Sequence, residues 1–324
     1  MTLTYRLAAL ILGFILDMIL GDPYSFPHPV RFIGKMIEAL EGAIRPRFSS
    51  SPQATRMGGT LLVLIVCLCA LGGTALIKHL LLRLNFWFAF TFETLICYQL
   101  LATKQLKVEA MKVYTALQKG SLEEARYAVS MIVGRDTASL DERGIIRAAV
   151  ETVAENASDG SIAPLLFLAI GGAPLGMFYK AVNTMDSMLG YMNEKYIDFG
   201  RTAAKLDDAV NFLPARIAGY LMCWAAQPSG LNRGEAFRVF YRDRLKHKSP
   251  NSAQTEAACA GALGVSLAGS NYYSGVLVDK PIIGDPLREI EREDIPRSCR
   301  LLYTTAVMAL AICAALMLLG SLVL

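Results

Sequence analysis

The sequence offers little from which a disulfide framework or a zinc site could be built. Its 7 cysteines include no CxxC pair. Most of them lie inside apolar segments, where a thiol serves as a small hydrophobic side chain. We therefore expect neither disulfides nor bound zinc.

The motifs of common nucleotide-binding and hydrolytic enzymes are absent as well. The chain has no GxxxxGK[ST] loop, no GxGxxG after a predicted strand, no HExxH and no GxSxG. The sequence alone therefore does not reveal how a nucleotide would bind. Nucleic acid is a poor candidate partner, because the basic segments carry nearly as many acids and no interleaved aromatic residues.

The chain is instead rich in apolar residues, and these are gathered in blocks. Hydrophobic residues make up 54% of the 324 positions, and the mean hydropathy is +0.39. Several blocks approach the roughly 20 residues that cross a bilayer. They span residues 58–77, 84–102, 162–178, 210–226 and 301–324. This pattern predicts an all-α, polytopic membrane bundle.

Basic residues lie mainly between the blocks, which places those loops on the cytoplasmic side of the membrane. The N-terminal run, residues 7–20, is short and contains Asp17, so its crossing is left open. No small-residue cleavage site follows it, and we expect it to be retained.

The blocks suggest one membrane-embedded domain, residues 1–324, with polar additions. Residues 58–82 and 84–103 predict an antiparallel membrane hairpin, and the cap signals within residues 104–158 predict a polar helical insert. A second polar region covers residues 227–300, and the small residues of its middle, 257–269, predict a closely packed helix.

Two blocks contain features that ordinary membrane helices avoid. Residues 162–178 hold Pro164, Gly171, Gly172 and Pro174, which predicts a broken or re-entrant helix. The block at 210–226 contains Pro214 and Arg216, and a charge at that depth should face protein or water.

A first polar cluster contains Glu151 and Glu155, one helical turn apart, and Asp159 beyond them. Asn156 and the residues after it are typical of a helix C-terminus, where carboxylates need a compensating cation. Magnesium or a bound ammonium would supply that cation. The alternative is a solvated helix end whose acids pair locally with Arg147.

Two further clusters follow the broken block. Lys180, Asn183 and Asp186 recur every three residues, so they lie along one helical face. Asp208 and Asn211 come together where the block at 210–226 begins. They indicate either ligand binding or a structural network between broken helices.

A basic run precedes a predicted helix start in the second polar region. Ser249 can be the N-cap and Pro250 the first helical residue, so Lys246 and Lys248 would meet free backbone amides beside Asn251. Positive charge at a helix N-terminus predicts a phosphate site. The alternative is a membrane-surface basic patch.

A proline-rich segment near the N-terminus contains His28 and Arg31. Its prolines predict a stiff, non-helical stretch that could orient ligands. His28 could equally be a surface hydrogen-bonding group, since no metal partner lies nearby.

Together these stretches resemble the adenosylcobinamide-phosphate synthase family of cobalamin biosynthesis over essentially the whole chain. The resemblance is carried by residues 22–34, 134–137, 151–160, 183–188, 207–216 and 248–252. It implies that a carboxylate of adenosylcobyric acid is joined to the amine of aminopropanol phosphate, or of a relative such as ethanolamine phosphate. ATP and magnesium are the implied cofactors.

The resemblance also implies roles for individual residues. Magnesium would be held by Glu155, Asp159 and Asp208, and Asp186, Asp208 and Glu155 would carry catalysis, with Asp186 accepting the proton of the amine. Substrate binding is expected from His28, Arg31, Lys180, Asn183, Lys246, Lys248, Ser249 and Asn251.

The implied location is the inner or plasma membrane, with the active site facing the cytoplasm. Lipid and the corrinoid are implied partners, and a homo-oligomer or a complex with other late cobalamin enzymes is left open. For a cytoplasmic site to include residues 183–211, the blocks at 162–178 and 210–226 must both fail to cross. A non-catalytic signalling relative and a small-molecule transporter are the alternatives.

Overall fold

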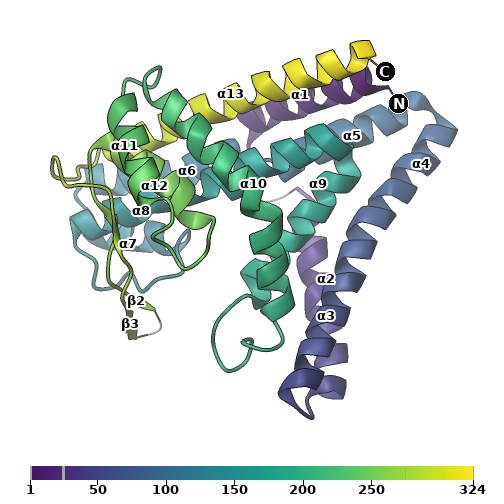
Figure 1. Ribbon diagram of the computed structural model, residues 1–324, viewed down its shortest axis with the longest axis horizontal. Helices are drawn as coiled ribbons and strands as arrows, with labels where there is room; N and C mark the ends of the chain where they lie inside the picture. The colour runs from purple at the N-terminus through teal and green to yellow at the C-terminus, as the bar shows by residue number, and fades with distance from the viewer. Residues whose placement is uncertain (1, 24–25, 274, 324) are drawn as a thin grey trace. The chain divides into compact units, whose positions relative to one another are not determined.

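The computed structural model describes residues 2–23, 26–273 and 275–323, and this part of the chain is mostly helical (Figure 1). Its α-helices are α1 (Leu3–Leu20), α2 (Pro29–Ile44), α3 (Pro52–Leu68), α4 (Thr74–Leu84), α5 (Phe86–Leu100), α6 (Thr103–Gln118), α7 (Leu122–Ser130), α8 (Glu142–Asn156), α9 (Ala163–Leu189), α10 (Arg201–Ala226), α11 (Arg233–Asp243), α12 (Ser252–Leu263) and α13 (Asp294–Val323). A short 3₁₀ helix (Arg45–Phe48) follows α2, and π-helical segments (Cys69–Gly73 and Ala157–Ile162) join α3 to α4 and α8 to α9.

The predicted helical membrane bundle is confirmed. Within the described residues, 5 helical stretches are long and apolar enough to cross a membrane: Leu3–Leu20, Pro52–Leu84, Phe86–Gln118, Glu142–Leu189 and Asp294–Leu322. Large apolar side chains such as Leu68, Leu76 and Leu316 are exposed on them. Such a surface suits lipid, because a water-soluble protein rarely exposes so much of it.

The chain divides into two compact units. Unit 1 contains residues 1–101, 163–211 and 312–324, and unit 2 contains residues 102–162 and 212–311. Unit 1 therefore holds α1 to α5 and α9, whereas unit 2 holds α6 to α8, α11, α12 and the strands. Helices α10 and α13 have residues in both.

The tight turn predicted for the hairpin of unit 1 is present, and the antiparallel packing of the two helices stays a prediction. Helices α4 and α5 are joined at Asn85, whose side chain accepts a hydrogen bond from the Trp87 N–H at 2.8 Å and so caps α5. Helix α1 packs against α5 at Gly13, where a Cβ would lie 2.5 Å from the Cβ of Cys97. Only glycine allows the two backbones to approach this closely.

The predicted break in the block at 162–178 is confirmed at Gly172, whose φ is +67°. The break frees the Ala173 N–H and the Ala169 carbonyl, which would otherwise bond each other. Glu93 accepts from the Ala173 N–H at 2.9 Å, and Arg6 donates to the Ala169 carbonyl at 3.1 Å. The Glu93 carboxylate is buried and lies 2.7 Å from the Lys78 ammonium, so the break is closed by an internal ion pair.

The junction between α8 and α9 differs from the expectation. Residues 156–160 were expected to end a helix, but the chain remains helical through the π-helical segment Ala157–Ile162. The physical reason is Pro164, which has no N–H to offer the Gly160 carbonyl. That carbonyl instead accepts from the Ala102 N–H at 2.9 Å. The diverted hydrogen bond widens the helix by one residue.

In unit 2, helix α12 is buried along its whole length, and its Gly261 lies directly against the backbone of α11. The close packing expected from small residues is therefore confirmed. The helix, however, ends at Leu263, because Gly264 adopts a left-handed conformation with φ +69°. Residues 265–269 lead into strands rather than continuing the helix.

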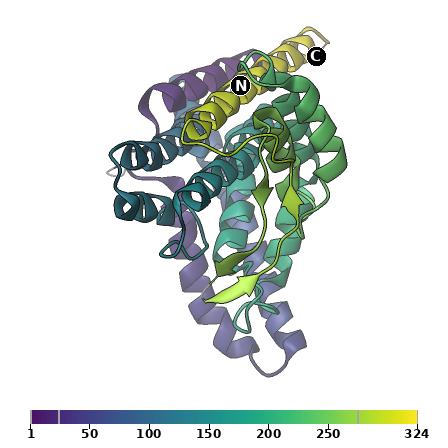
Figure 2. The ribbon, with the colours of Figure 1, turned by 90° about the vertical axis from the view of Figure 1, so that its left-hand side faces the viewer.

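Two small antiparallel sheets follow α12 and were not predicted (Figure 2). Strand β1 (Leu267–Ala268) pairs with β4 (Ile282–Ile283), and β2 (Asn271–Tyr273) pairs with β3 (Val276–Val278). The strands are only 2 or 3 residues long, too short to show a period-2 pattern in the sequence.

The Lys78–Glu93 pair gives a stability prediction. Lys78→Met should lower the free energy of unfolding by roughly 3–5 kcal/mol, because it leaves a buried carboxylate without its cation. Adding Glu93→Gln should recover most of the loss, since the amide oxygen can still accept from Ala173 N–H. Thermal unfolding in detergent measures both, with Lys119→Met as the exposed control. Equal stability of the single and double variants would contradict this account.

The number of crossings gives a second prediction. Helix α10 is not among the stretches long and apolar enough to span, whereas the stretch that contains α9 is. We expect α9 to enter and return on the cytoplasmic side, because of its break at Gly172. Single cysteines at Tyr191 and Asn193, in a background without exposed Cys69, should resist a membrane-impermeant thiol reagent in intact cells. Labelling in intact cells would place this loop outside.

Candidate active site

A cavity of about 250 Å³ lies in unit 2. It is bounded by the loop after α7, by α8, by the turn before α12, by α12 itself and by the strands. Its lining is dominated by charged and titratable side chains: Arg135, Glu151, Glu155, His247, Glu256 and Lys280.

Glu151 is a structural carboxylate in this cavity. It is buried, it forms an ion pair with Arg135, and its other oxygen accepts from the Ala268 N–H at 2.5 Å. Ala268 is the sole non-glycine with positive φ, +60°, in the described residues. The Glu151 carboxylate thus holds a strained turn of β1 in place. The pairing with Arg147 considered from the sequence is replaced by Arg135.

Glu155 and Glu256 have more freedom to act on a ligand. Glu155 is one helical turn after Glu151 and is exposed, whereas Glu256 on α12 is 6% exposed. No hydrogen bond to the Glu256 carboxyl group is found within the described ranges. Burial, followed by the charges of Glu155 and Glu151, raises the pKa of Glu256 well above its ordinary value.

Hydrogen-bond donors complete the cavity. Lys280 donates to the Tyr273 hydroxyl at 2.9 Å, which orients its ammonium group. The Ser249 N–H donates to His247 Nδ1 at 3.1 Å, so a neutral His247 carries its proton on Nε2. Burial lowers the pKa of His247, which favours this neutral form.

The loop 134–137 is held in the cavity wall by contacts of Arg135 and Asp136. Arg135 is held by Glu151, and Asp136 binds the β2–β3 turn through two hydrogen bonds. Its N–H donates to the Tyr272 carbonyl at 2.9 Å, and its carboxylate accepts from Gly275 N–H at 2.7 Å. The loop therefore couples α8 to the strands.

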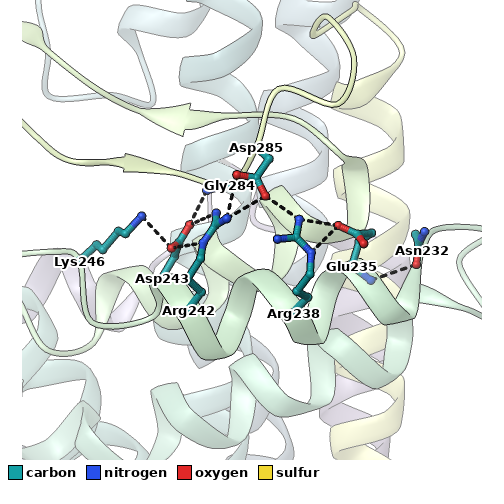
Figure 3. Close-up of polar contacts among 8 residues, drawn as sticks. All are labelled: Asn232, Glu235, Arg238, Arg242, Asp243, Lys246, Gly284 and Asp285. Atoms are coloured by element: carbon teal, nitrogen blue, oxygen red, sulfur yellow. Dashed lines mark hydrogen bonds and ion pairs between the residues drawn. The ribbon is translucent and has the colours of Figure 1, made fainter.

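Lys246 belongs to a different network, centred on Asp243 (Figure 3). The fully buried Asp243 carboxylate binds Arg242 and Lys246, each at 2.7 Å, and accepts from the Gly284 N–H at 2.8 Å. Although burial opposes ionisation, these contacts hold the pKa of Asp243 well below its usual range. Arg242 also binds Asp285, so the network fastens α11 to the chain after β4. Lys246 is thus part of a structural network, and its role in substrate binding stays a prediction.

The helix start expected at Ser249 and Pro250 is wrong by two residues. Helix α12 begins at Ser252, with Asn251 as its N-cap. The reason is local: the Ser249 hydroxyl accepts from the Asn251 N–H at 3.3 Å and forms a turn before the helix. Asn251 is buried and its side chain accepts from Arg216 at 3.4 Å. Lys248 is exposed beside His247, so its phosphate role stays a prediction.

Unit 1 contains a second polar cluster, on α9 and α10. Asn211 is buried and accepts from the Tyr179 hydroxyl at 2.9 Å. Asp186, Asn183 and Asn211 are the neighbours of the Asp207 carboxyl group. The structure therefore brings the predicted Asn183 and Asp186 together with Asp207, which the sequence analysis did not single out. Asp208 is the more exposed neighbour.

His28 and Arg31 lie at the start of α2, also in unit 1. His28 is the N-cap: its Nδ1 accepts from the Val30 N–H at 3.2 Å, and its Nε2 is 3.7 Å from the Asp22 carboxylate. Arg31 lies in the first helical turn, so the expected non-helical stretch is wrong at this position. Pro29 explains the difference, since proline is favoured at the first helical position. Tyr24 and Ser25 of this motif lie outside the described residues.

Lys180 belongs to the surroundings of His28. Burial, opposed by Asp22, lowers the pKa of His28, and the charge of Lys180 contributes to the lowering. Lys180 precedes Asn183 by one turn of α9, so the His28 segment adjoins the cluster around Asp207.

The predicted magnesium ligands fall in both units. Glu155 and Asp159 belong to unit 2, and Asp208 belongs to unit 1. In the part of the chain that the structure describes, no three His, Cys, Asp or Glu side chains gather closely enough to hold a metal ion. These residues therefore do not fit a protein-only metal cage, and the shared magnesium site stays a prediction.

Sequence reasoning missed several of the residues that the structure brings together. Glu256 carried a signal, since it is an acid at the head of a run of small residues. Asp207 is next to Asp208, which the sequence pointed to as a site residue. The two differ only in their burial in the folded protein, where Asp207 is the more buried. Lys280 carried no signal, because it lies in the loop between β3 and β4, in a polar region without a motif.

Comparisons with known proteins agree with this description. A sequence model of the family described as "CobD/Cbib protein" matches residues 10–302. The cobalamin biosynthesis protein CobD of Clostridium tetani is 46% identical over 305 residues, covering 94% of this chain and 96% of the relative. CbiB of Salmonella typhimurium is 45% identical over 301 residues, covering 93% and 94%. No solved structure matches the chain.

Asp207 gives a prediction for pH dependence. Burial and the charge of Asp186 raise its pKa from 3.8 to about 7. The folded state thus binds this proton more tightly than the unfolded state, so stability is gained as pH falls from about 7 towards 4 and lost above 7. Asp207→Asn should flatten this slope and stabilise the protein at pH 8 by roughly 1–4 kcal/mol.

Unfolding midpoints between pH 5 and pH 8 in detergent measure this effect, with the exposed Glu194→Gln as control. A slope unchanged by Asp207→Asn would show that Asp207 is ionised in the folded protein.

Proposed function

The chain belongs to the CobD/CbiB family of cobalamin biosynthesis proteins, and from this premise we propose that it is an adenosylcobinamide-phosphate synthase. In the proposed reaction, a carboxylate of adenosylcobyric acid and the amine of aminopropanol phosphate, or of a close relative, are joined in an amide bond. Free carboxylates do not react with amines at useful rates, so the carboxylate must first be activated. ATP hydrolysis would supply that activation.

The observation that carries the proposal is the extent of the family match. Residues 10–302 include every residue of the unit 2 cavity and of the polar cluster around Asp207. The motifs that resemble the synthases, from residue 22 to residue 252, all fall within it. A match confined to the apolar helices would support only a shared membrane fold.

The polar residues suit such a reaction. An amine attacking an acyl carbon must lose a proton, and a carboxylate such as Asp186 would accept it. We assign substrate contacts to His28, Arg31, Lys180 and Asn183, all of which belong to unit 1. ATP phosphates would need cations, for which the exposed Lys248 is available.

A transporter is the main alternative, because transporters also use broken helices. In those proteins the N-terminus of a half-helix faces the substrate. Here the N–H groups at the Gly172 break point to the protein's own Glu93, which is already paired with Lys78. The break is thus filled by protein groups, and this observation favours the synthase.

The test is a turnover assay with the purified protein in lipid nanodiscs. ATP hydrolysis should require both adenosylcobyric acid and aminopropanol phosphate, and the product should contain one new amide per ATP consumed. Asp186→Asn should lower kcat by roughly 10²–10⁴-fold if it accepts the proton. Glu194→Gln, at an exposed position of the same unit, should retain full activity.

Two outcomes would sink the proposal. One is ATP hydrolysis that is indifferent to either substrate. The other is uptake of corrinoid into sealed vesicles without amide formation, which would support transport instead.

A further inference from the structure

Two carboxylates of the unit 2 cavity, Glu155 and Glu256, form no hydrogen bond and no close ion pair within the described residues. Glu151 is satisfied by Arg135 and the Ala268 N–H. Glu256, by contrast, is 94% buried, lines the cavity and accepts no hydrogen bond within the described part of the chain. A buried carboxyl group without a partner is costly, so its presence calls for a ligand that supplies one.

The ligand should be a cation at this end of the cavity. Glu151, Glu155 and Glu256 all line this cavity, where Arg135 is already paired with Glu151 and Lys280 contacts Tyr273. Two carboxylates at close quarters are both ionised only when a positive group lies between them. A cation bound between Glu155 and Glu256 would remove this conflict.

A metal ion and an ammonium group could both supply the charge. A metal held by protein alone needs several ligands in fixed geometry, and the described residues contain no cluster of three suitable side chains. An ammonium group needs only two or three hydrogen-bond acceptors. Magnesium can also be held by one or two carboxylates together with water and substrate phosphate, so a metal titration is needed to separate it from an amine.

Donors in the same cavity define the rest of the ligand. Lys280 uses one of its three hydrogens on Tyr273 and keeps the others for a ligand. His247 accepts from the Ser249 N–H through Nδ1, which leaves Nε2–H as a donor. An ammonium ion and a neutral imidazole donor together suit a phosphate group.

The size of the cavity limits the ligand further. Its volume of about 250 Å³ corresponds to roughly eight water molecules. Pockets for drug-sized ligands are larger, about 300–1,000 Å³. The cavity therefore matches a short amino alcohol phosphate in volume more closely than a whole nucleoside triphosphate or corrin ring.

We propose that this cavity is the binding site for the amine substrate, with Glu155 and Glu256 holding its ammonium group and Lys280 and His247 holding its phosphate. The proposal rests on the proposed synthase function for the identity of the amine. It gives Glu155 a role in amine binding in place of metal binding. It also assigns functions to Glu256, His247 and Lys280.

The experiment measures binding directly, without ATP or corrinoid. The full-length protein in nanodiscs is titrated by calorimetry with aminopropanol phosphate, with aminopropanol and with propanol phosphate. Glu256→Gln should weaken the two amines by roughly 10- to 100-fold, the loss of a charge-assisted contact, and leave propanol phosphate unchanged. Lys280→Met should weaken the two phosphates and leave aminopropanol unchanged.

Matched controls separate local from global effects. Glu123→Gln and Lys119→Met change exposed residues of the same unit and should bind all three compounds as the unmodified protein does. Thermal unfolding is recorded for every variant. If Glu256→Gln does not fold, Glu155→Gln serves as the second variant, with the same expected selectivity for amines.

The outcomes are distinguishable from those of the turnover assay. Selective loss of amine binding in Glu256→Gln supports the site even if no amide is formed. Equal binding of all three compounds by every variant overturns it, even in an active synthase. Titration with Mn²⁺ alone is the remaining arm: Mn²⁺ binding that requires Glu155 and Glu256, with amine binding unaffected, would make the cavity a metal site.

Discussion

The Glu93 carboxylate determines the path of the chain through unit 1. Inside an apolar layer, a helix can be interrupted only where the freed backbone groups find protein partners, because lipid offers none. At Gly172 the freed N–H of Ala173 goes to Glu93 and the freed carbonyl of Ala169 goes to Arg6. Helices α1, α4 and α5 therefore each contribute to the break in α9. The direction in which α9 presents Asn183 and Asp186 depends on this arrangement.

The same rule operates at the junction of α8 and α9. The Gly160 carbonyl cannot bond Pro164 and turns to the Ala102 N–H, which produces the π-helical segment and keeps the two helices continuous. Immediately before this segment, α8 presents Glu151 and Glu155 to the cavity. Glu151 stabilises the strained turn at Ala268, so one side chain of the cavity is structural and its neighbour one turn later is available to a ligand. Two carboxylates one helical turn apart thus have different roles: Glu151 accepts a backbone hydrogen bond, and Glu155 is available to a ligand.

Much of the architecture could be read from the order of the residues. The apolar blocks predicted the membrane helices, and the glycines and prolines of residues 162–178 predicted the broken helix. The cap signals within residues 104–158 predicted a helical insert, and Ser121 is indeed the N-cap of α7, accepting from the Glu124 N–H at 3.2 Å. These features depend on backbone conformation and on local periodicity, which neighbours in the sequence specify. The errors were also local. The Ser249 hydroxyl forms a turn before α12 and does not cap the helix. Pro29 begins helix α2, so Arg31 is helical and does not lie in a rigid loop.

The sequence by itself determined that this chain is a helical membrane protein with its polar residues concentrated in a few motifs, because hydropathy and residue spacing act along the chain. Only the tertiary structure decided which polar residues face a common cavity. Glu256, His247 and Lys280 are separated by loops and short strands, and their meeting depends on how α12 packs against α8 and α11. Likewise, Asp207 and Asp208 are equivalent in sequence, but burial against α9 selects Asp207. Burial and charge proximity are properties of contacts between distant segments, and no local pattern encodes them.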